Sequence, residues 1–511
     1  MRNKLVIIGL MLILLFSLTG CNSAKDSSKM RQLDDIAHKR VGVSNGTIFD
    51  GFVANKYPQA QINRYSGTSD MVIALKTDKL DAMVIDYISA NVLLKSNNDL
   101  AILSDDVMPM YFGIGFNKNN PALRERFNAF LKESKTNGVY DEVYQRWFKN
   151  DPEQAVMPDI KNNPAGKKVV LGVSVADLPY VAVMNGKYVG FDIEIIQNFA
   201  AREGYNLEIV SMEFSSLIAA LSSGKVDMIT DGIAITEERS KQIDFSDSYL
   251  EGKTAVVCLK ENMAGYEDQS AQSAVSPSIG QKISSSFNSN LIVEDRYLLI
   301  VEGLKVTAII SVLSLIFGTL LGALICLMRM SRNRVASLIA RVYISILRGT
   351  PVLVLLMLVF YVVFASVNID PVVVAVIAFG MNFAAYVSEM FRTSIESVDQ
   401  GQREAGIAGG FTPLQTFIYI ILPQAVRQVL PVYKGEFISL VKMTSVVGYI
   451  AVQDLTKASD IIRSRTFDAF FPLVLVAVLY FSISWLLALS LDYIGLRTDP
   501  KRKRRLSKVG A

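Results

Sequence analysis

The stretch "DMITDGIAITEERSKQIDFSDSYL" (residues 227–250) carries the pattern on which the fold of the first half of the chain depends. It begins as a short apolar strand and runs into a polar loop that contains Arg239. Upstream, "KVVLGVS" (168–174) is typical of a buried strand, and "FDIEIIQNFAAREG" (191–204) has helical spacing and ends at a glycine. Strands that alternate with helices predict an α/β lobe built on a parallel sheet.

Bulk composition narrows the class of protein. The 511 residues leave room for two or three domains, and 51% of them are hydrophobic. The net charge of +4 gives no sign of nucleic-acid binding. The one basic cluster, "KRKRR" (501–505), follows a long apolar run and is typical of a cytoplasmic membrane flank. With only Cys21, Cys258 and Cys326, and the last of these in an apolar run, we expect no disulfide framework.

The N-terminus predicts export. Arg2 and Lys4 precede the apolar run "LVIIGLMLILLFSLTG" (5–20), which is short for a membrane span and ends in small residues. The segment "LTGC" (18–21) resembles a bacterial lipobox, so we expect residues 1–21 to be a lipoprotein-type signal and Cys21 to be lipidated. An uncleaved signal anchor is the alternative. In either case the residues that follow lie outside the cytoplasmic membrane.

Further apolar runs predict a membrane domain over residues 293–496. Each run is near the roughly 20 residues needed to cross hydrocarbon. The four clear runs are 306–328, 349–369, 371–388 and 469–491, and a weaker fifth run is 436–453. Five spans that start outside end inside, which places the loop "RMSRNRVASLIAR" (329–341) and the basic tail (497–511) in the cytoplasm, as the positive-inside rule requires. The predicted fold of this part is all-α with about five helices.

The loop before the fifth run carries a sharp motif, "QGQREAGIAGGFTPLQTFIYIILPQAVRQVLP" (400–431). It resembles the EAA loop of ATP-binding-cassette (ABC) importer permeases, with Glu404, Ala405 and Gly410 in the matching positions. In that family the segment is a short cytoplasmic helix that fits a cleft of the ATPase subunit. A glutamate suits the start of a helix, and Gly410 permits a turn after it. Gly406 departs from the alanine usual there, and an ordinary amphipathic helix is the alternative.

Other segments resemble the permeases for polar amino acids, the histidine, glutamate, glutamine and arginine group. They are "ILRGTPVLVLL" (346–356), "AAYVSEMFRTSIESVDQGQREA" (384–405) and "GEFISLVKMTSVVG" (435–448). The chain has no G-x-x-x-x-G-K-[ST] phosphate loop, so the resemblance implies a separate ATPase subunit that binds ATP and Mg²⁺. We expect no cofactor in this chain. Permeases of this kind work as pairs of membrane domains, which makes a homodimer the simplest expectation.

The first half resembles the periplasmic amino-acid-binding proteins, two-lobed α/β clamps of type II, but in an unusual order. Residues 164–262 resemble lobe one, from "GFD" (190–192) to "DFSDSY" (244–249). Residues 30–110 resemble lobe two, with "VGVSNGT" (41–47) and "LDAMVIDY" (80–87), and residues 111–150 resemble the segment that returns to lobe one. The binding domain, 25–262, therefore resembles a circular permutation, joined to the permease by a linker at 263–292. We expect one covalent crossing between the lobes, near residues 108–113, and hence a loose hinge.

Family resemblance also assigns binding roles. Arg239 offers a planar fork suited to a carboxylate, and Asp86 occupies the position that accepts the ammonium group of an amino acid. A surface arginine and a residue at a strand end are the plain alternatives. Phe214 matches an aromatic that lines the pocket. The other candidate substrate contacts are Thr47, Gly232, Ala234 and Thr236, together with Asp231 and Asp177, which could favour a cationic or amide side chain or could cap helices.

The sequence as a whole predicts a transport subunit and not an enzyme: a multi-pass protein of the cytoplasmic membrane, with an extracytoplasmic binding domain and a cytoplasmic C-terminus. We expect it to serve an importer for glutamine, glutamate or a basic amino acid. An amino-acid-gated channel or receptor is the alternative, since such proteins also join a clamp to a membrane domain. The EAA motif argues against that alternative. Its expected partners are the ATPase subunit, the amino acid and the membrane, with no nucleic acid.

Overall fold

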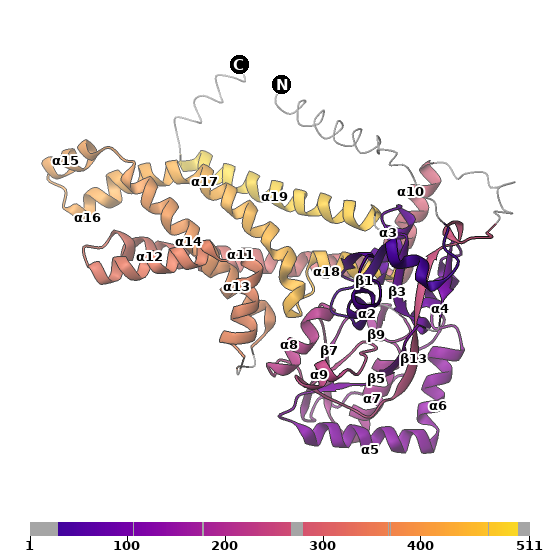
Figure 1. Cartoon of the computed structure of the whole chain (residues 1–511). Helices are drawn as coiled ribbons and strands as arrows, with labels where there is room; N and C mark the ends of the chain where they lie inside the picture. The colour runs from indigo at the N-terminus through magenta and orange to yellow at the C-terminus, as the bar shows by residue number, and fades with distance from the viewer. Residues whose placement is uncertain are drawn as a thin grey trace.

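A computed structural model describes residues 29–498, apart from Asp106, 176–177, 267–278, Ser366, Asn368 and Ala469. Figure 1 shows an α/β part, coloured indigo to magenta, beside a helical part coloured salmon to yellow. The predicted lipidation site Cys21, the candidate site residue Asp177 and the basic tail lie outside the described residues. An α/β clamp followed by a helical membrane domain agrees with the fold class predicted from the sequence.

The first sheet of the α/β part has the strand order β2-β1-β3-β13-β4. β1 is parallel to β2 and β3, whereas β13 is antiparallel to both of its neighbours, β3 and β4. The central strand β3 is apolar and buried at its first four residues, as expected for a strand covered on both faces. We call the unit built on this sheet lobe two. Its elements are η1 (Leu33–His38), β1 (Arg40–Ser44), α2 (Ile48–Lys56), β2 (Gln61–Tyr65), α3 (Thr68–Lys76), β3 (Ala82–Asp86), α4 (Tyr87–Ser96), β4 (Leu100–Ser104) and β13 (Leu250–Leu259).

The second sheet has the order β10-β7-β11-β6-β12, and we call the unit built on it lobe one. β7 is parallel to β10 and β11, while β6 is antiparallel to β11 and β12. Helix α7 ends at Gly204 in the left-handed conformation, as its sequence predicts. The elements of lobe one are β6 (Gly115–Phe116), α5 (Pro121–Asn137), α6 (Val139–Tyr144), η2 (Gln145–Lys149), β7 (Lys168–Val173), β8 (Ala182–Met184), β9 (Lys187–Val189), α7 (Phe191–Glu203), β10 (Asn206–Ser211), η3 (Phe214–Ser216), α8 (Leu217–Ser222), β11 (Met228–Thr230), α9 (Glu237–Ser240) and β12 (Asp244–Phe245).

Two strands, and not one, cross between the lobes. The chain passes from β4 of lobe two through β5 (Pro109–Phe112) to β6 of lobe one. It returns along β13, whose first residues pair antiparallel with β5 and whose later residues enter the sheet of lobe two between β3 and β4. The expectation of a single crossing with a loose hinge is therefore wrong. It failed because β13 is ten residues long, enough to pair with β5 and then with a second set of strands.

The chain enters and leaves the clamp at the same place on lobe two. Met30 and Met263 form a parallel β-bridge. The Met30 amide donates to the Asn262 carbonyl at 2.8 Å, and the Ala264 amide donates to the Met30 carbonyl at 2.8 Å. Residues 150–167, which join the return segment to lobe one, have no helix or strand and are mostly exposed, as a surface joint should be.

The helical part contains three helices that are long and apolar enough to cross a membrane: α11 (Tyr297–Met330), α14 (Pro371–Glu396) and residues 470–490 of α19 (Phe470–Thr498). If each of two bent helix pairs counts as one span, the described residues hold up to five. The remaining helices are α10 (Ile279–Phe287), η5 (Asn288–Ile292), η6 (Val293–Asp295), α12 (Arg334–Gly349), α13 (Val352–Leu358), η7 (Val359–Val363), α15 (Gln400–Ala408), α16 (Pro413–Thr416), η8 (Phe417–Ile421), α17 (Leu422–Met443), η9 (Thr444–Ile450) and α18 (Leu455–Thr466).

The bent pairs differ from the predicted spans in detail. The segment 329–341, expected as a loop, is helical except at residues 331–333, and α12 meets the next helix at 111°. The weak fifth run, expected at 436–453, belongs to a helical stretch that begins much earlier and ends in η9. The sequence hides this because α17 carries polar residues and Pro431 in its first half, which lower its apolar signal.

Figure 1 places the clamp at one end of the helical part and α15 with α16 at the opposite end. α11 and α14 pack along each other through small residues: a Cβ atom added at Gly318 would lie 2.7 Å from the Gly380 carbonyl oxygen. Close approach through small residues is the usual basis of helix packing in membranes. The binding domain and the EAA segment are thus separated by the length of these helices.

Candidate functional site

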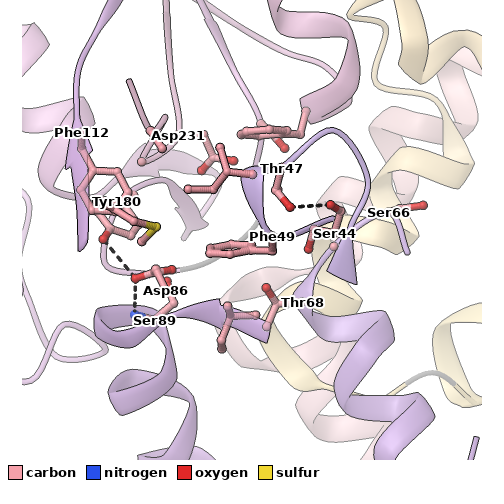
Figure 2. Close-up of a pocket in the computed structure, with 18 of the residues that line it drawn as sticks. Ser44, Thr47, Phe49, Ser66, Thr68, Asp86, Ser89, Phe112, Tyr180 and Asp231 are labelled. Atoms are coloured by element: carbon pink, nitrogen blue, oxygen red, sulfur yellow. Dashed lines mark hydrogen bonds between the residues drawn. The ribbon is translucent and has the colours of Figure 1, made fainter. Parts of the chain in front are cut away.

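A cavity lies between the two lobes and is lined by residues from both (Figure 2). Lobe two contributes Ser44, Thr47, Phe49, Thr68, Asp86 and Ser89, among others, and lobe one contributes Ser174, Tyr180, Phe214, Asp231, Gly232, Ala234 and Arg239. Met110 and Phe112 come from the crossing segment. Residues that lie far apart in the sequence therefore meet in one site, as the single-clamp prediction requires.

Arg239 is a buried cation that faces this cavity. It is only 8% exposed, and burial lowers the pKa of its guanidinium to about 10. Its Nη1 donates to the Ala234 carbonyl at 2.7 Å, and its Nη2 donates across the lobes to the Gly46 carbonyl at 2.9 Å. The Phe214 ring lies 5.7 Å from the guanidinium carbon. Within the described residues both of these acceptors are neutral, so the cation retains the capacity to pair with a carboxylate.

Asp86 ends strand β3 and caps α4. One carboxylate oxygen accepts from the Ser89 amide at 2.8 Å and from the Tyr180 hydroxyl at 3.1 Å, and the second bond joins lobe two to lobe one. Figure 2 shows the Tyr180 hydroxyl directed at Asp86, with Thr47 and Ser44 at another side of the cavity. Burial raises the pKa of Asp86, because the charged form loses solvation that these hydrogen bonds only partly replace. An ammonium group is a suitable partner for this carboxylate.

Of the other predicted contacts in the described residues, five line the cavity and Thr236 does not. Thr47, Gly232, Ala234, Phe214 and Asp231 line the cavity. Thr47 is the N-cap residue of α2, and its hydroxyl donates to the Ser44 carbonyl at 2.6 Å.

Thr236 does not line the described cavity. Its hydroxyl caps α9 by accepting from the Arg239 amide at 3.2 Å, so it helps to position the arginine. Thr236, and not Asp231, is the N-cap residue of α9, the helix that follows this loop.

The sequence interpretation missed the aromatic wall and its support. Phe49, Phe112 and Tyr180 line the cavity, and Tyr180 lies in the turn before β8. Gly232 packs against the Tyr180 ring: a Cβ atom there would lie 3.0 Å from it, and the backbone has φ +54°. Gly232 is thus the residue that both its conformation and its neighbour require.

Asp192 supports the cavity wall at Gly232 through hydrogen bonds. It is fully buried and accepts hydrogen bonds from the Gly232 amide at 3.0 Å, the Tyr249 hydroxyl at 2.8 Å and the Thr230 hydroxyl. Burial raises the pKa of Asp192 to about 6. The "GFD" segment had marked this residue as part of lobe one, but its partners are 38 to 57 residues away and no local pattern could name them.

The clamp rests on the helical part through the segment 451–467, which we call the strap. Lys457 pairs with Glu213 of lobe one at 2.8 Å, and Arg463 pairs with Asp70 of lobe two. The strap also presents Gln453, whose amide donates to the Tyr188 hydroxyl at 2.8 Å, and Ile461, which is 1% exposed and packs in the main core of the clamp. Both lobes therefore contact one segment of the helical part.

A second set of contacts joins lobe one to the turn after η7. The Lys225 ammonium donates to the Phe364 carbonyl and to the Val367 carbonyl, the latter at 2.9 Å. It also lies 5.0 Å from the centre of the Phe360 ring. Buried or half-buried charges paired across an interface specify its register, so these contacts define one docked arrangement.

The EAA segment forms a helical hairpin at the other end. Glu404 and Ala405 lie exposed on α15, while Gly406 is buried. A Cβ atom at residue 406 would lie 2.6 Å from the Thr416 Cγ2, so glycine, and not the usual alanine, fits the close approach of α15 and α16. Gly410 has φ +86° and makes the turn, as predicted. The exposed face of α15 is available to a partner.

Comparisons with known proteins bear on both parts of the chain. The profile of the family described as bacterial extracellular solute-binding proteins, family 3, matches residues 52–150 and 169–436. The L-cystine transport system permease protein TcyB of Bacillus subtilis is 41% identical over 199 residues, which cover 39% of this chain and 85% of that protein. A putative glutamine transport system permease protein GlnP of Rickettsia felis is 34% identical, over 38% of this chain and 89% of that protein.

The arginine transport system permease protein ArtQ of Bacillus subtilis is 34% identical over 40% of this chain and 92% of that protein. A solved structure described as an amino acid ABC transporter with histidines is 32% identical, covers 43% of this chain and 99% of that chain, and has a TM-score of 0.38. From the profile match, and from the coverage of 85% or more of each of these permeases, the chain belongs to the bacterial extracellular solute-binding proteins of family 3 and carries, in the same polypeptide, a permease domain of the amino-acid ABC transporters.

Proposed function

We propose that the protein is the combined receptor and permease subunit of an importer for a polar amino acid. One observation carries the proposal: a single cavity presents a buried cation, Arg239, and a half-buried carboxylate, Asp86, in a chain that also contains a permease domain. A free α-amino acid brings one carboxylate and one ammonium group, and both need partners when buried. The two partners come from different lobes, so the ligand favours the closed clamp.

The class of side chain follows from the rest of the wall. Ser44, Thr68 and Ser174 add hydroxyl groups, and Asp231 adds a carboxylate, beside the rings of Phe49 and Phe214. Such a wall suits a side chain with an amide, a cation or a disulfide-linked second amino-acid group. The relatives are named for cystine, glutamine and arginine, and these three are the candidate substrates.

The clamp is circularly permuted in this proposal. The usual order, lobe one before lobe two, would connect the end of β13 to the start of lobe two. These two points lie side by side, because Met30 and Met263 form a β-bridge. The exposed joint 150–167 then replaces the usual ends of the chain. We assign residues 30–110 to lobe two, 111–150 to the return segment and 164–262 to lobe one, within a binding domain of 25–262.

The proposed orientation places the clamp outside the cytoplasmic membrane and the EAA hairpin inside. The opposite positions of these two parts support it (Figure 1). Glu404 and Ala405 then face an ATPase subunit, which binds ATP and Mg²⁺, and Gly410 shapes the hairpin. A homodimer of the permease domain and a lipid on Cys21 complete the proposal. Substrate closes the clamp, the strap holds the closed form, and ATP binding by the partner alternates access through the membrane.

The test combines binding with uptake. Thermal unfolding of the full chain in detergent is measured with each common L-amino acid; a ligand at 100 times its Kd stabilises the folded state by about 2.7 kcal/mol. The full chain is then reconstituted with its ATPase subunit, and uptake of L-cystine, L-glutamine and L-arginine is measured. We expect stabilisation by at least one of the three and uptake of that compound only with ATP. Uptake without ATP, or ion current on amino-acid addition, would contradict the importer.

A further inference from the structure

Each of the two charged groups in the binding cavity is hydrogen-bonded to the opposite lobe. Arg239 of lobe one donates to the Gly46 carbonyl of lobe two at 2.9 Å. Asp86 of lobe two accepts from the Tyr180 hydroxyl of lobe one at 3.1 Å. Opening of the lobes would break both bonds. Closure of the clamp is thus linked to the same two groups that would bind the carboxylate and the ammonium group of an amino acid.

Tyr180 is held firmly by its surroundings. Its side chain is 4% exposed, and the centre of its ring lies 5.4 Å from that of Phe112 and 6.0 Å from that of Phe148. Its backbone carbonyl accepts from the Asp192 amide at 3.3 Å. Burial raises the pKa of Tyr180 well above its ordinary value, so the hydroxyl keeps its proton and remains a donor. A ring fixed in this way directs its hydroxyl to one place.

The bond from Tyr180 also fixes the carboxylate that receives it. Two hydrogen bonds end on the same oxygen of Asp86, Oδ1: one from the Ser89 amide at 2.8 Å and one from the Tyr180 hydroxyl (Figure 2). The other oxygen, Oδ2, is then the one that an ammonium N–H can reach, because each carboxylate oxygen has its own acceptor sites. The Tyr180 hydroxyl is a neutral donor, so it orients the carboxylate and leaves its negative charge for the ligand. The bond from Ser89 lies within lobe two, whereas the bond from Tyr180 requires lobe one to be close.

We propose that Tyr180 is a positioning residue of the clamp, whose hydroxyl orients Asp86 for the ammonium group of the ligand only when the two lobes are together. The inference rests on the proposed amino-acid clamp and adds to it a residue that acts through Asp86. Recognition of the ammonium group and closure of the lobes then stabilise each other. Loss of the hydroxyl alone should therefore weaken binding, while the later steps of transport proceed as before.

The experiment compares Tyr180→Phe with the unaltered protein, because phenylalanine keeps the packed ring and removes only the hydroxyl. Kd is measured by calorimetry on the full chain in detergent, with the amino acid that gives the largest thermal stabilisation. KM and maximal rate are measured from uptake by the full chain with its ATPase subunit in proteoliposomes. Tyr140→Phe is the matched control: its hydroxyl donates to the Tyr249 carbonyl at 2.6 Å, and Tyr140 is not among the residues that line the cavity. Tyr180→Phe is also combined with Asp86→Asn.

We expect Tyr180→Phe to raise Kd about tenfold or more, as for the loss of a hydrogen bond to a charged group. KM should rise by a similar factor with the maximal rate unchanged, since the hydroxyl acts in binding and not after it. Tyr140→Phe should bind like the unaltered protein. In the Asp86→Asn protein, which itself binds weakly, the further change Tyr180→Phe should have little effect on KM, because the hydroxyl acts through that carboxylate.

An unchanged Kd for Tyr180→Phe would overturn the proposal. An effect of the same size in the Asp86→Asn protein would overturn it as well, because the hydroxyl would then act independently of the carboxylate. A Tyr180→Phe protein that did not fold would contradict it too, since the hydroxyl would belong to the core of lobe one. If instead no amino acid stabilised the unaltered protein, the amino-acid clamp itself would fail.

Discussion

Replacement of Arg239 by alanine tests the binding site most directly. The guanidinium is 8% exposed, and its described acceptors are two neutral carbonyl groups. Burial lowers its pKa from 12.5 to about 10, which corresponds to about 3 kcal/mol of lost stabilisation of the charged form. A substrate carboxylate can restore an amount of this order, which lies inside the range of about 2–5 kcal/mol found when one partner of a buried charged pair is removed.

We therefore expect Arg239→Ala to weaken binding about 100-fold. The affinity of Arg239→Lys should lie between those of the unaltered protein and Arg239→Ala, because an ammonium keeps the charge and loses the planar fork. The assay is calorimetric titration of the full chain in detergent with the amino acid that gives the largest thermal stabilisation. Arg202→Ala is the matched control: Arg202 lies exposed on lobe one, pairs with Glu133 and with Glu203, and is not among the residues that line the cavity.

An unchanged Kd for a folded Arg239→Ala protein would refute the reasoning and move the carboxylate site elsewhere. Unfolding at an unchanged temperature, relative to the unaltered protein without ligand, establishes that the variant is folded. If the alanine variant does not fold, Arg239→Gln keeps a planar donor without the charge and serves the same comparison. A loss confined to the rate of uptake, with normal Kd, would also contradict the assignment, since it would place Arg239 after binding.

Three further predictions follow from other contacts. Burial raises the pKa of Asp192 from 3.8 to about 6, so the folded state binds a proton more tightly than the unfolded state does. The resulting stabilisation of the folded state, about 3 kcal/mol, is present below pH 4 and is lost as the pH rises to about 6. The thermal unfolding of Asp192→Asn should lack this pH dependence between pH 4 and 7. Lys457→Glu or Glu213→Lys alone should reduce substrate-stimulated ATP hydrolysis, because each breaks a half-buried ion pair of 2.8 Å. The double exchange should recover most of the hydrolysis. A double variant with no more activity than either single variant would exclude a role of the pair in docking. Glu404→Lys should abolish ATP-driven uptake with the Kd of the clamp unchanged, since the residue is exposed on α15; normal uptake would count against its contact with the ATPase.

Much of the clamp could be predicted because its signals are local. The strand and helix pattern around "DMITDGIAIT" predicted the lobe, and the family spacing placed Arg239, Asp86 and Phe214, which the structure brings to one cavity. The hinge could not be predicted in the same way. β13 is one continuous run of residues, and nothing in its sequence shows that its two halves pair with different strands.

The contacts between the clamp and the permease lay beyond the sequence for a related reason. Lys457 and Glu213 are 244 residues apart, and Arg463 and Asp70 are 393 apart. Each residue alone reads as an ordinary charge on a solvated helix or loop. Similarly, the buried partners of Asp192 come from the other end of lobe one, so only the fold shows that the residue supports Gly232.

The bridge between Met30 and Met263 has a mechanical consequence. Because the chain enters and leaves the clamp side by side on lobe two, a pull on the linker loads that lobe alone and passes no force across β5 and β13. When the clamp is not docked, lobe two is then the jaw attached to the tether, and lobe one is attached only through the crossing strands. The energy of closure should therefore be independent of the length and stiffness of the tether, which leaves the tether free to vary in length without changing how tightly the jaws hold their cargo.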